Sequence, residues 1–335
     1  MSDAATLARA LARLPRWHGL REDALQKLPE KGLAHAHWRI AGQGLLVRVP
    51  RSPDRDQSLL RQATCFQRLE PCGRTPLLHA VLKPSAELPG GALIVDEIEG
   101  RPPRWPAELS LVAETLAAIH SLPLPPEDER PPLPDPVDPF AATLQGIERN
   151  RPLLDRAGAS ADALRQIDEE LSWARAFAAG DGLKDAPKRL VVTDAHPGNF
   201  VVTPAGQAMF VDLEKGAYGA PGIDVAPATL RPSPQWDPDC GTVLTRDEIG
   251  RFMRAYFIGA GPALEQAMRP TLLPMRRLTW LRTTLAFARF KVEHTATALD
   301  AEAARHADMV IADSLSADTI AHIRSEWLGP DPLTF

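Results

Sequence analysis

The stretch 190–226 constrains this chain more than any other part of its sequence. A strand-like run leads into the polar loop 194–199, which reads DAHPGN, and two further β-rich runs, 200–202 and 208–211, follow. Residues 204–207, between these two runs, include proline and glycine, which predicts a β-hairpin. Asp212 stands at the end of the second run. A rigid hairpin would therefore bring two carboxylates and a carboxamide close together.

Phosphoryl transfer requires a set of side chains of this kind. One carboxylate accepts the proton of the attacking hydroxyl, and an amide with a second carboxylate holds Mg²⁺ on the nucleotide. A single Asp after a strand is usually just a turn or capping residue. The combination of Asp194, Asn199 and Asp212 around one hairpin favours the catalytic interpretation over the structural one.

This stretch resembles the kinase-like phosphotransferases that include aminoglycoside phosphotransferases and choline and ethanolamine kinases. Their catalytic loop usually reads His-Gly-Asp-x-His-x-x-Asn and is followed by Asp-Phe-Glu or Asp-x-Asp. Here the Asp-x-His-Pro-Gly-Asn core is intact, and residues 212–214 read Asp-Leu-Glu. Residues 219–226 are similar to the family's Gly-x-Pro-x-x-Asp-Leu-Ala. The departure is at Val192 and Thr193, which replace the first His and Gly.

The resemblance implies a role for each polar residue of this stretch. Asp194 would be the catalytic base, and Asn199 and Asp212 would bind metal. Three further residues would support them: His196, Glu214 and Asp224. Asp224 would brace the loop, His196 would pack and hydrogen-bond within it, and Glu214 would help to position metal or substrate. A solvated carboxylate is an equal alternative for Glu214.

The resemblance also implies a nucleotide site in the first hundred residues. Gly32 lies in the first hairpin, where backbone N–H groups approach phosphate oxygens. Arg48 stands where family members carry the strand cation that grips the α- and β-phosphates. Gln62 replaces the helix glutamate that normally pairs with this cation. Asp96 and Ile98 lie in the linker whose backbone would meet the adenine edge. An ordinary turn at Gly32 and a solvated Arg48 are the structural alternatives.

The pattern of predicted elements changes along the chain. Short β-rich segments around one helix precede a Pro-rich stretch, 121–140, and helix-forming segments dominate after it, the longest over 276–298. We interpret the Pro-rich stretch as an extended surface connector, with a disordered binding segment as the alternative. The predicted fold is α+β and bilobal, as in protein kinases. A small antiparallel-sheet lobe with the inter-lobe linker at its end (1–100) precedes a larger, mainly helical lobe (101–335).

Composition disfavours several classes of protein. The 335 residues carry a formal net charge of −5, so nucleic acid is not the expected partner. No apolar run approaches the roughly 20 residues that a membrane helix needs, and no signal peptide is visible. The three cysteines, Cys65, Cys72 and Cys240, are expected to be reduced thiols. These features predict a cytoplasmic protein and say nothing about its oligomeric state.

We therefore expect a phosphotransferase that uses ATP and Mg²⁺ and moves the γ-phosphate to a hydroxyl of a small molecule. By resemblance, the acceptor is a cationic amino alcohol or an aminoglycoside-like compound. Aromatic and acidic side chains suited to a cation are Trp236, Asp237, Trp280 and Glu293. Core packing is the alternative for Trp280.

Two other functions remain open at the level of sequence. Val192 and Gln62 favour a nucleotide-binding pseudokinase with weak or no turnover, which would serve as a binding or regulatory protein. A metal-dependent hydrolase could instead use Asp194, His196 and Asp212, because Asp-x-His places two ligands on one face of an extended segment. No second histidine cluster supports the hydrolase.

Overall fold

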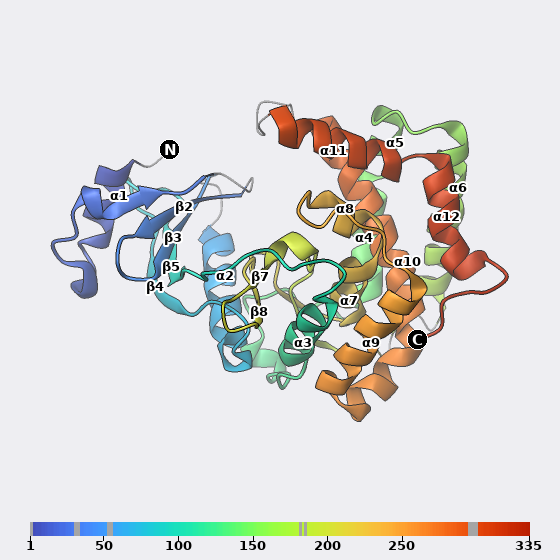
Figure 1. Ribbon diagram of the computed structural model, residues 1–335, viewed down its shortest axis with the longest axis horizontal. Helices are drawn as coiled ribbons and strands as arrows, with labels where there is room; N and C mark the ends of the chain where they lie inside the picture. Colours follow the sequence, from blue (N-terminus) through green and yellow to red (C-terminus); the bar gives the residue numbers. More distant parts are fainter. Residues whose placement is uncertain (1–2, 30–33, 52–55, 181–182, 184–185, 294–300) are drawn as a thin grey trace.

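The computed structural model describes residues 3–29, 34–51, 56–180, 183, 186–293 and 301–335. Figure 1 shows a small lobe built on a β-sheet, coloured blue, and a larger lobe made mainly of helices. The expected α+β, bilobal architecture is therefore confirmed. None of the described helices combines the length and the apolar character that crossing a bilayer requires.

The small lobe is an antiparallel sheet of five strands in the order β1-β2-β3-β5-β4. The strands are β1 (Leu25–Lys27), β2 (His35–Ile40), β3 (Leu45–Pro50), β4 (Leu78–Leu82) and β5 (Ala92–Asp96). α1 (Ala4–Leu11) packs on one face of the sheet and α2 (Asp56–Leu69) on the other. Because successive side chains of a strand point to opposite faces, the strands supply two separate cores.

The chain leaves β5 through residues 97–100 and passes beside β7 (Phe200–Val202). Arg101 and Val202 exchange two backbone hydrogen bonds, of 3.1 and 2.8 Å. A Cβ on Gly100 would lie 2.4 Å from the Val202 carbonyl oxygen, so glycine permits this close passage. The linker is thus attached directly to the hairpin that carries Asp212.

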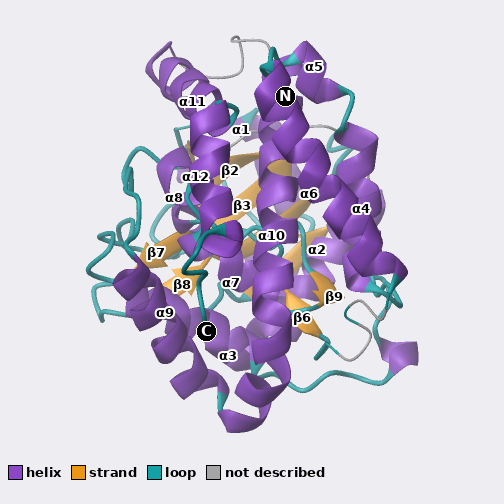
Figure 2. Cartoon of the chain, turned by 90° about the vertical axis from the view of Figure 1, so that its right-hand side faces the viewer, coloured by secondary structure: helices purple, strands orange, loops and turns teal. Residues whose placement is uncertain are grey.

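Two short antiparallel sheets, each of two strands, and a long series of helices build the large lobe. β6 (Arg189–Val191) pairs with β9 (Ala217–Gly219), and β7 pairs with β8 (Ala208–Phe210). The helices are α3 (Leu109–His120), α4 (Pro139–Asn150), α5 (Leu153–Arg156), α6 (Ala161–Ala179), α7 (Gly222–Thr229), α8 (Pro232–Trp236), α9 (Arg246–Ala260), α10 (Pro262–Glu293), α11 (Ala301–Ser314) and α12 (Ala317–Leu328). Figure 2 shows α10 in the middle of this lobe, where it contacts α4 to α9 and α11.

α10 begins at Pro262 rather than at the expected Arg276, and it continues through Pro270 and Pro274. A proline inside a helix removes a backbone hydrogen bond and costs about 3 kcal/mol or more. Leu272, between the two prolines, is buried in the core. Packing of this kind outweighs the local cost of the two prolines. The local sequence pattern contains no information about this packing, so it predicts a later helix start.

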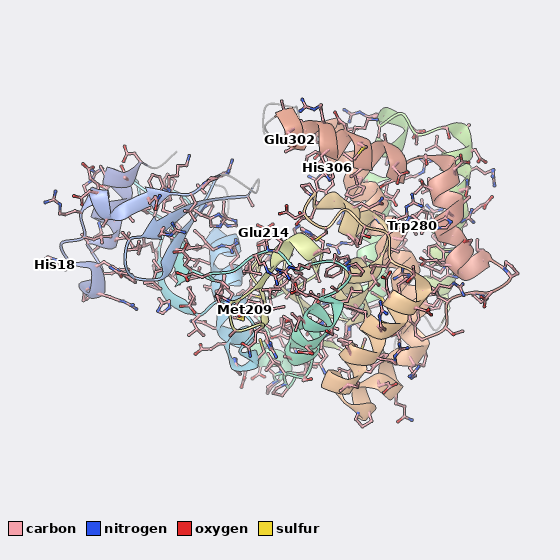
Figure 3. The ribbon with its side chains drawn as sticks, in the orientation of Figure 1. His18, Met209, Glu214, Trp280, Glu302 and His306 are labelled. Carbon is pink, nitrogen blue, oxygen red and sulfur yellow. The ribbon has the colours of Figure 1, made fainter. Side chains whose placement is uncertain are left out.

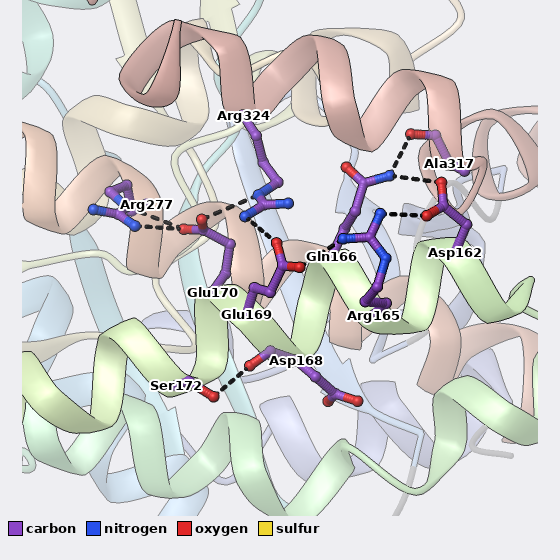
Figure 4. Close-up of polar contacts among 10 residues, drawn as sticks. All are labelled: Asp162, Arg165, Gln166, Asp168, Glu169, Glu170, Ser172, Arg277, Ala317 and Arg324. Carbon is purple, nitrogen blue, oxygen red and sulfur yellow. Dashed lines mark hydrogen bonds and ion pairs between the residues drawn. The ribbon is translucent and has the colours of Figure 1, made fainter.

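A buried ion-pair cluster fastens α6 to α10 and α12 (Figure 4). The Glu170 side chain is 1% exposed and accepts hydrogen bonds from Arg277 (3.0 Å) and Arg324 (3.1 Å). The Arg277 guanidinium also lies 3.4 Å from the centre of the Trp173 ring. Two cations thus compensate one buried carboxylate, which would be costly to bury alone.

The Pro-rich stretch runs from the end of α3 to the start of α4. The 3₁₀ turn η4 (Glu127–Glu129) is its short regular segment. From α2, Arg68 donates hydrogen bonds to the carbonyl oxygens of Glu129, Arg130 and Pro131. These contacts place the stretch against α2; its role as a connector stays a prediction.

Candidate active site

One buried carboxylate holds the loop that follows β6. Asp224, on α7, is completely buried and accepts hydrogen bonds from the backbone N–H groups of Val192 and Thr193, both at 2.7 Å. His120 Nε2 lies 3.0 Å from the same carboxylate, and His120 Nδ1 lies 2.8 Å from the Tyr256 hydroxyl. This brace, as we name the Asp224–His120–Tyr256 chain, connects the loop to α3 and α9.

Thr193 has a left-handed backbone, with φ of 57°, and is the one non-glycine residue with positive φ in the described part of the chain. A β-branched residue is rare in this region, and such strain costs about 1–3 kcal/mol. The Thr193 hydroxyl donates a hydrogen bond of 2.8 Å to the Lys215 carbonyl oxygen. The chain therefore adopts, with threonine, a conformation that favours glycine, and uses the hydroxyl to fix Lys215.

Asp194, Asn199 and Asp212 are joined through the backbone of the loop and the hairpin. Asn199, which ends the 3₁₀ turn η5 (Pro197–Asn199), donates from Nδ2 to the Asp194 carbonyl oxygen at 2.9 Å. The Val211 N–H donates to the Asn199 carbonyl oxygen at 2.9 Å, and Asp212 follows directly. Because Nδ2 is used inside the loop, the side-chain oxygen of Asn199 is left for a ligand.

Arg48 reaches the hairpin from β3 in the small lobe. Its Nη1 donates to the Val211 carbonyl oxygen at 2.8 Å, and its Nη2 donates to Asp212 Oδ1 at 3.1 Å. The Arg48 side chain is 8% exposed, and its Nε has no hydrogen-bond partner among the described residues. Gln62 is buried nearby on α2 and hydrogen-bonds His35. An inter-lobe cation thus lies directly against the proposed metal ligand.

Lys215 and Glu214 surround the carboxylate of Asp194 with charge. Lys215 Nζ lies 2.5 Å from Asp194 Oδ2 and 3.8 Å from Glu214 Oε1. Burial raises the pKa of Asp194, but the ammonium of Lys215 and the ring of His196 outweigh it and hold that pKa below its usual value. Burial and the nearby Asp212 raise the pKa of Glu214. Asp194 is therefore ionised at neutral pH.

Two histidines on β2 line the small-lobe side of the site. His35 Nδ1 lies 3.5 Å from Glu214 Oε2, and the rings of His35 and His37 are 6.3 Å apart. Burial and the Arg48 cation lower the pKa of His35 to about 3 and that of His37 to about 4. Both rings are therefore neutral at neutral pH and add no charge beside Arg48.

Asp237 approaches the catalytic loop from the end of α8. A Cβ on Gly198 would lie 2.4 Å from Asp237 Oδ2, so glycine lets the Asp237 side chain come this close to the loop. His196 Nδ1 accepts a hydrogen bond of 3.2 Å from the Gly198 N–H, an interaction within the loop. Half-buried Trp236 stacks on Phe287, with ring centres 5.0 Å apart. This side of the loop thus combines a carboxylate with an aromatic surface.

Two of the expected substrate residues are occupied in other ways. Trp280 is completely buried and packs on Trp327, with ring centres 5.7 Å apart. Figure 3 shows Trp280 among the helices, well separated from Glu214. The expected substrate contact of Trp280 is therefore wrong, because burial in the helical core removes its ring from any bound acceptor. Glu293, at the end of α10, accepts a hydrogen bond of 2.6 Å from Arg289.

Apart from Arg48, the residues expected to bind nucleotide differ in whether their backbone groups are already hydrogen-bonded. Gly32 lies outside the described residues, as does the end of the expected helix, 294–298. The Asp96 N–H donates to the Leu77 carbonyl oxygen at 3.1 Å, and the Asp96 carboxylate accepts from Leu77 N–H at 2.9 Å. Within the described residues, the Ile98 backbone takes part in no hydrogen bond. The backbones of Glu99 and Gly100 likewise take part in no hydrogen bond among the described residues, so Ile98 is one of several such linker positions.

Several residues at the site were not expected from the sequence. They are His35, His120, Lys215 and Tyr256. Lys215 had a possible signal, because it directly follows the Asp-Leu-Glu triplet. His120 and Tyr256 had no such sequence signal. Their helices are far from the loop in sequence, and they approach it only in the folded chain.

A cavity of about 580 Å³ lies elsewhere, beside α9 and the start of α10. Phe257, Ile258 and Arg269 are among its lining residues, and none of the expected catalytic or metal-binding residues is. The carboxylates, the amide and the buried cation meet instead at the hairpin between the lobes.

The fold and the site together define a kinase-like phosphotransferase. Residues 27–271 match the phosphotransferase enzyme family, and the chain belongs to this family. It is accordingly an enzyme, a small-molecule kinase that transfers phosphate to a hydroxyl. No curated protein matches the sequence.

Solved structures share the fold over most of their length. They include choline kinase from Cryptosporidium parvum (14% identity, TM-score 0.62, 97% of each chain covered). Ethanolamine kinase from Plasmodium vivax is similar (14% identity, TM-score 0.60, covering 90% of this chain and 85% of that one). So is a choline/ethanolamine kinase family protein from Mesorhizobium loti (18% identity, TM-score 0.57, covering 95% and 98%). At these identities the likeness shows the fold alone.

Proposed function

We propose that this kinase transfers the γ-phosphate of ATP to a hydroxyl of a small, cationic acceptor. The observation that carries the proposal is the junction of the two lobes, where Arg48 contacts Asp212 on the hairpin that also fixes Asn199 and Asp194. Transfer of a phosphoryl group depends mainly on positioning and on charge. The junction supplies both in one place.

The donor set suits magnesium. The Asn199 side-chain oxygen and the Asp212 carboxylate are the hard oxygen ligands that Mg²⁺ prefers, and they would hold it. Among the described residues, no group of three or more His, Cys, Asp and Glu could hold a metal by itself. This fits an ion shared with substrate phosphates and disfavours the hydrolase. When bound, Mg²⁺ would neutralise charge on the β- and γ-phosphates.

Each protein group then has a definable task. Asp194, ionised because Lys215 and His196 lower its pKa, orients the acceptor hydroxyl and takes its proton late in the transfer. Arg48 directs a fixed positive charge at the nucleotide. Asp224 keeps the loop in place from behind.

The acceptor would lie between the catalytic loop and α8. Asp237 and the face of Trp236 suit a cation, through a carboxylate contact and a cation–π contact. Amino alcohols and aminoglycosides carry both a cation and a hydroxyl. We therefore expect the substrate in these chemical classes.

The test is ATP consumption by the purified protein against a panel of amino alcohols, aminoglycosides and sugars, with Asp194→Asn alongside. We expect turnover with at least one acceptor and a loss of about 10²- to 10⁴-fold in kcat for Asp194→Asn. Asp239→Asn, which alters an exposed carboxylate near the loop, is the matched control and should keep wild-type turnover. Full activity of Asp194→Asn would refute the base assignment.

The pseudokinase alternative is separated in the same experiment. It was suggested by Val192, which cannot replace the loop histidine of the family. The backbone of Val192 is nevertheless held, because Asp224 accepts its N–H and His120 contacts Asp224. Binding of Mg-ATP without transfer to any acceptor on the panel would favour the pseudokinase.

A further inference from the structure

One departure from the family's sequence pattern, Thr193, contacts Lys215 in the structure. Thr193 stands where the family has glycine, and its hydroxyl holds the carbonyl oxygen of Lys215 at 2.8 Å. Lys215 returns its ammonium to the same loop, 2.5 Å from Asp194 Oδ2. The strained residue and the lysine therefore form one unit around the proposed base. Backbone strain of this kind persists where the surrounding structure enforces it, often at functional sites.

The Lys215 ammonium lies where it could contact both the acceptor and the phosphoryl group that is transferred. It lies between Asp194 and Glu214, whose Oε1 is 3.8 Å away, and the Lys215 side chain is 46% exposed. It occupies Oδ2 of Asp194 and leaves Oδ1 for an acceptor hydroxyl. A hydroxyl on that oxygen would bring the attacking atom close to the lysine. The transferred phosphoryl group must arrive at the same point.

Charge balance at the site favours a cation at the position of Lys215. Asp194, Asp212 and Glu214 gather three carboxylates near a site for a triphosphate, which is itself an anion. Arg48 is paired with Asp212, on the small-lobe side. Lys215 is the cation paired with Asp194, on the acceptor side. Exposed ion pairs by themselves contribute little to stability, so folding alone does not explain this arrangement.

We propose that Lys215 is a catalytic residue whose ammonium contacts the γ-phosphoryl group as it passes from ATP to the acceptor. This inference rests on the proposed kinase function. The acceptor oxygen forms a bond to the γ-phosphorus, and the bond to the bridging oxygen breaks, leaving its electron pair on ADP. The acceptor proton moves to Asp194. Lys215 keeps its proton and supplies positive charge where negative charge develops.

The experiment measures binding of a transition-state analogue alongside turnover. The full chain is titrated with Mg-ADP and with Mg-ADP plus aluminium fluoride, in the presence of an acceptor that supports turnover. The variants are Lys215→Met and Lys215→Arg. Lys188→Met is the matched control, because Lys188 forms an ion pair of 2.7 Å with Asp135 away from the loop. Thermal unfolding of each variant checks that it is folded.

Lys215→Met should weaken the aluminium fluoride complex at least tenfold while changing Mg-ADP binding less than about twofold. Its kcat should fall about a hundredfold, as for loss of one transition-state donor, with KM for ATP unchanged. Lys215→Arg should recover part of both effects, and Lys188→Met should resemble wild type. Thr193→Ser, which keeps the hydroxyl, should retain more activity than Thr193→Gly.

Several distinct results would overturn the proposal. Equal loss of both complexes would make Lys215 a ground-state nucleotide contact, and loss of neither would make it a structural ion pair. A rise in turnover for Lys215→Met would mean that the lysine blocks the base. A wild-type protein that transfers phosphate to no acceptor, and binds the analogue no better than ADP, would refute the proposed function and this inference with it. Analogue binding that stays tight in Lys215→Met would refute the inference alone.

Discussion

The catalytic loop and the acceptor side that faces it are held in opposite ways. The loop is fixed from behind by the brace of Asp224, His120 and Tyr256, which is buried and joins three helices. The acceptor side consists of half-buried Trp236 and Asp237 at the end of a short helix, α8. The loop that would perform the chemistry is thus anchored to buried side chains on three helices, whereas the groups that would choose the acceptor are carried by one short helix. The chemistry can be read from the chain more easily than the substrate.

The largest effect should come from the hairpin end of the loop. Asp212→Asn removes the charge shared by the metal site and Arg48, and we expect kcat to fall by a factor of about 10³, since charge terms dominate this catalysis. The variant should also need more Mg²⁺ for half-maximal rate. A magnesium titration of turnover measures both. Retention of more than a tenth of wild-type kcat would contradict the assignment.

Loss of the brace itself should appear in stability. Asp224→Ala leaves the N–H groups of Val192 and Thr193 and the ring of His120 without their buried partner. Breaking a buried polar cluster in this way costs about 3–5 kcal/mol. Urea unfolding followed by circular dichroism measures the change. A loss below 1 kcal/mol would show that the loop is held by other contacts.

Loss of the hydrogen bond at the Tyr256 end of the brace should reduce stability and turnover less than loss of Asp224. Tyr256→Phe removes one hydrogen bond to His120, which should lower the free energy of unfolding by about 1 kcal/mol and slow turnover slightly. Tyr218→Phe is the matched comparison, because its hydroxyl bonds Arg68 rather than the brace. It should match the stability loss and leave turnover unchanged. Equal kinetic effects in both variants would separate the brace from catalysis.

The smallest effect should come from the acceptor side. Trp236→Ala should raise KM for a cationic acceptor about two- to fivefold, the size of one exposed cation–π contact. The value of kcat and the KM for ATP should stay at wild-type levels. Steady-state kinetics with each substrate varied in turn gives all three numbers. A large fall in kcat with unchanged acceptor KM would make Trp236 part of the catalytic machinery instead.

The sequence predicts local features of this molecule well. The hairpin at 200–211 is present, because turn residues act within a few positions. The bilobal fold followed from the family resemblance. The residues of the catalytic loop are close in sequence, so their proximity follows from the local turn.

Features that depend on contacts between residues distant in sequence could not be predicted from the sequence. His120 meets Asp224 across more than a hundred residues, and no spacing pattern encodes that contact. The Trp280 ring is chemically suited to contact a cation. Only the folded structure shows that this ring is buried. The start of α10 was missed because prolines signal a break locally, whereas burial against the rest of the lobe decides the outcome.

The most direct measurement is a crystal structure of the protein with Mg²⁺ and a non-hydrolysable ATP analogue. We predict metal density in contact with Asn199 and Asp212, the triphosphate against Arg48, and the terminal phosphate facing Asp194. A nucleotide bound away from this hairpin, or a metal held by other side chains, would contradict this prediction.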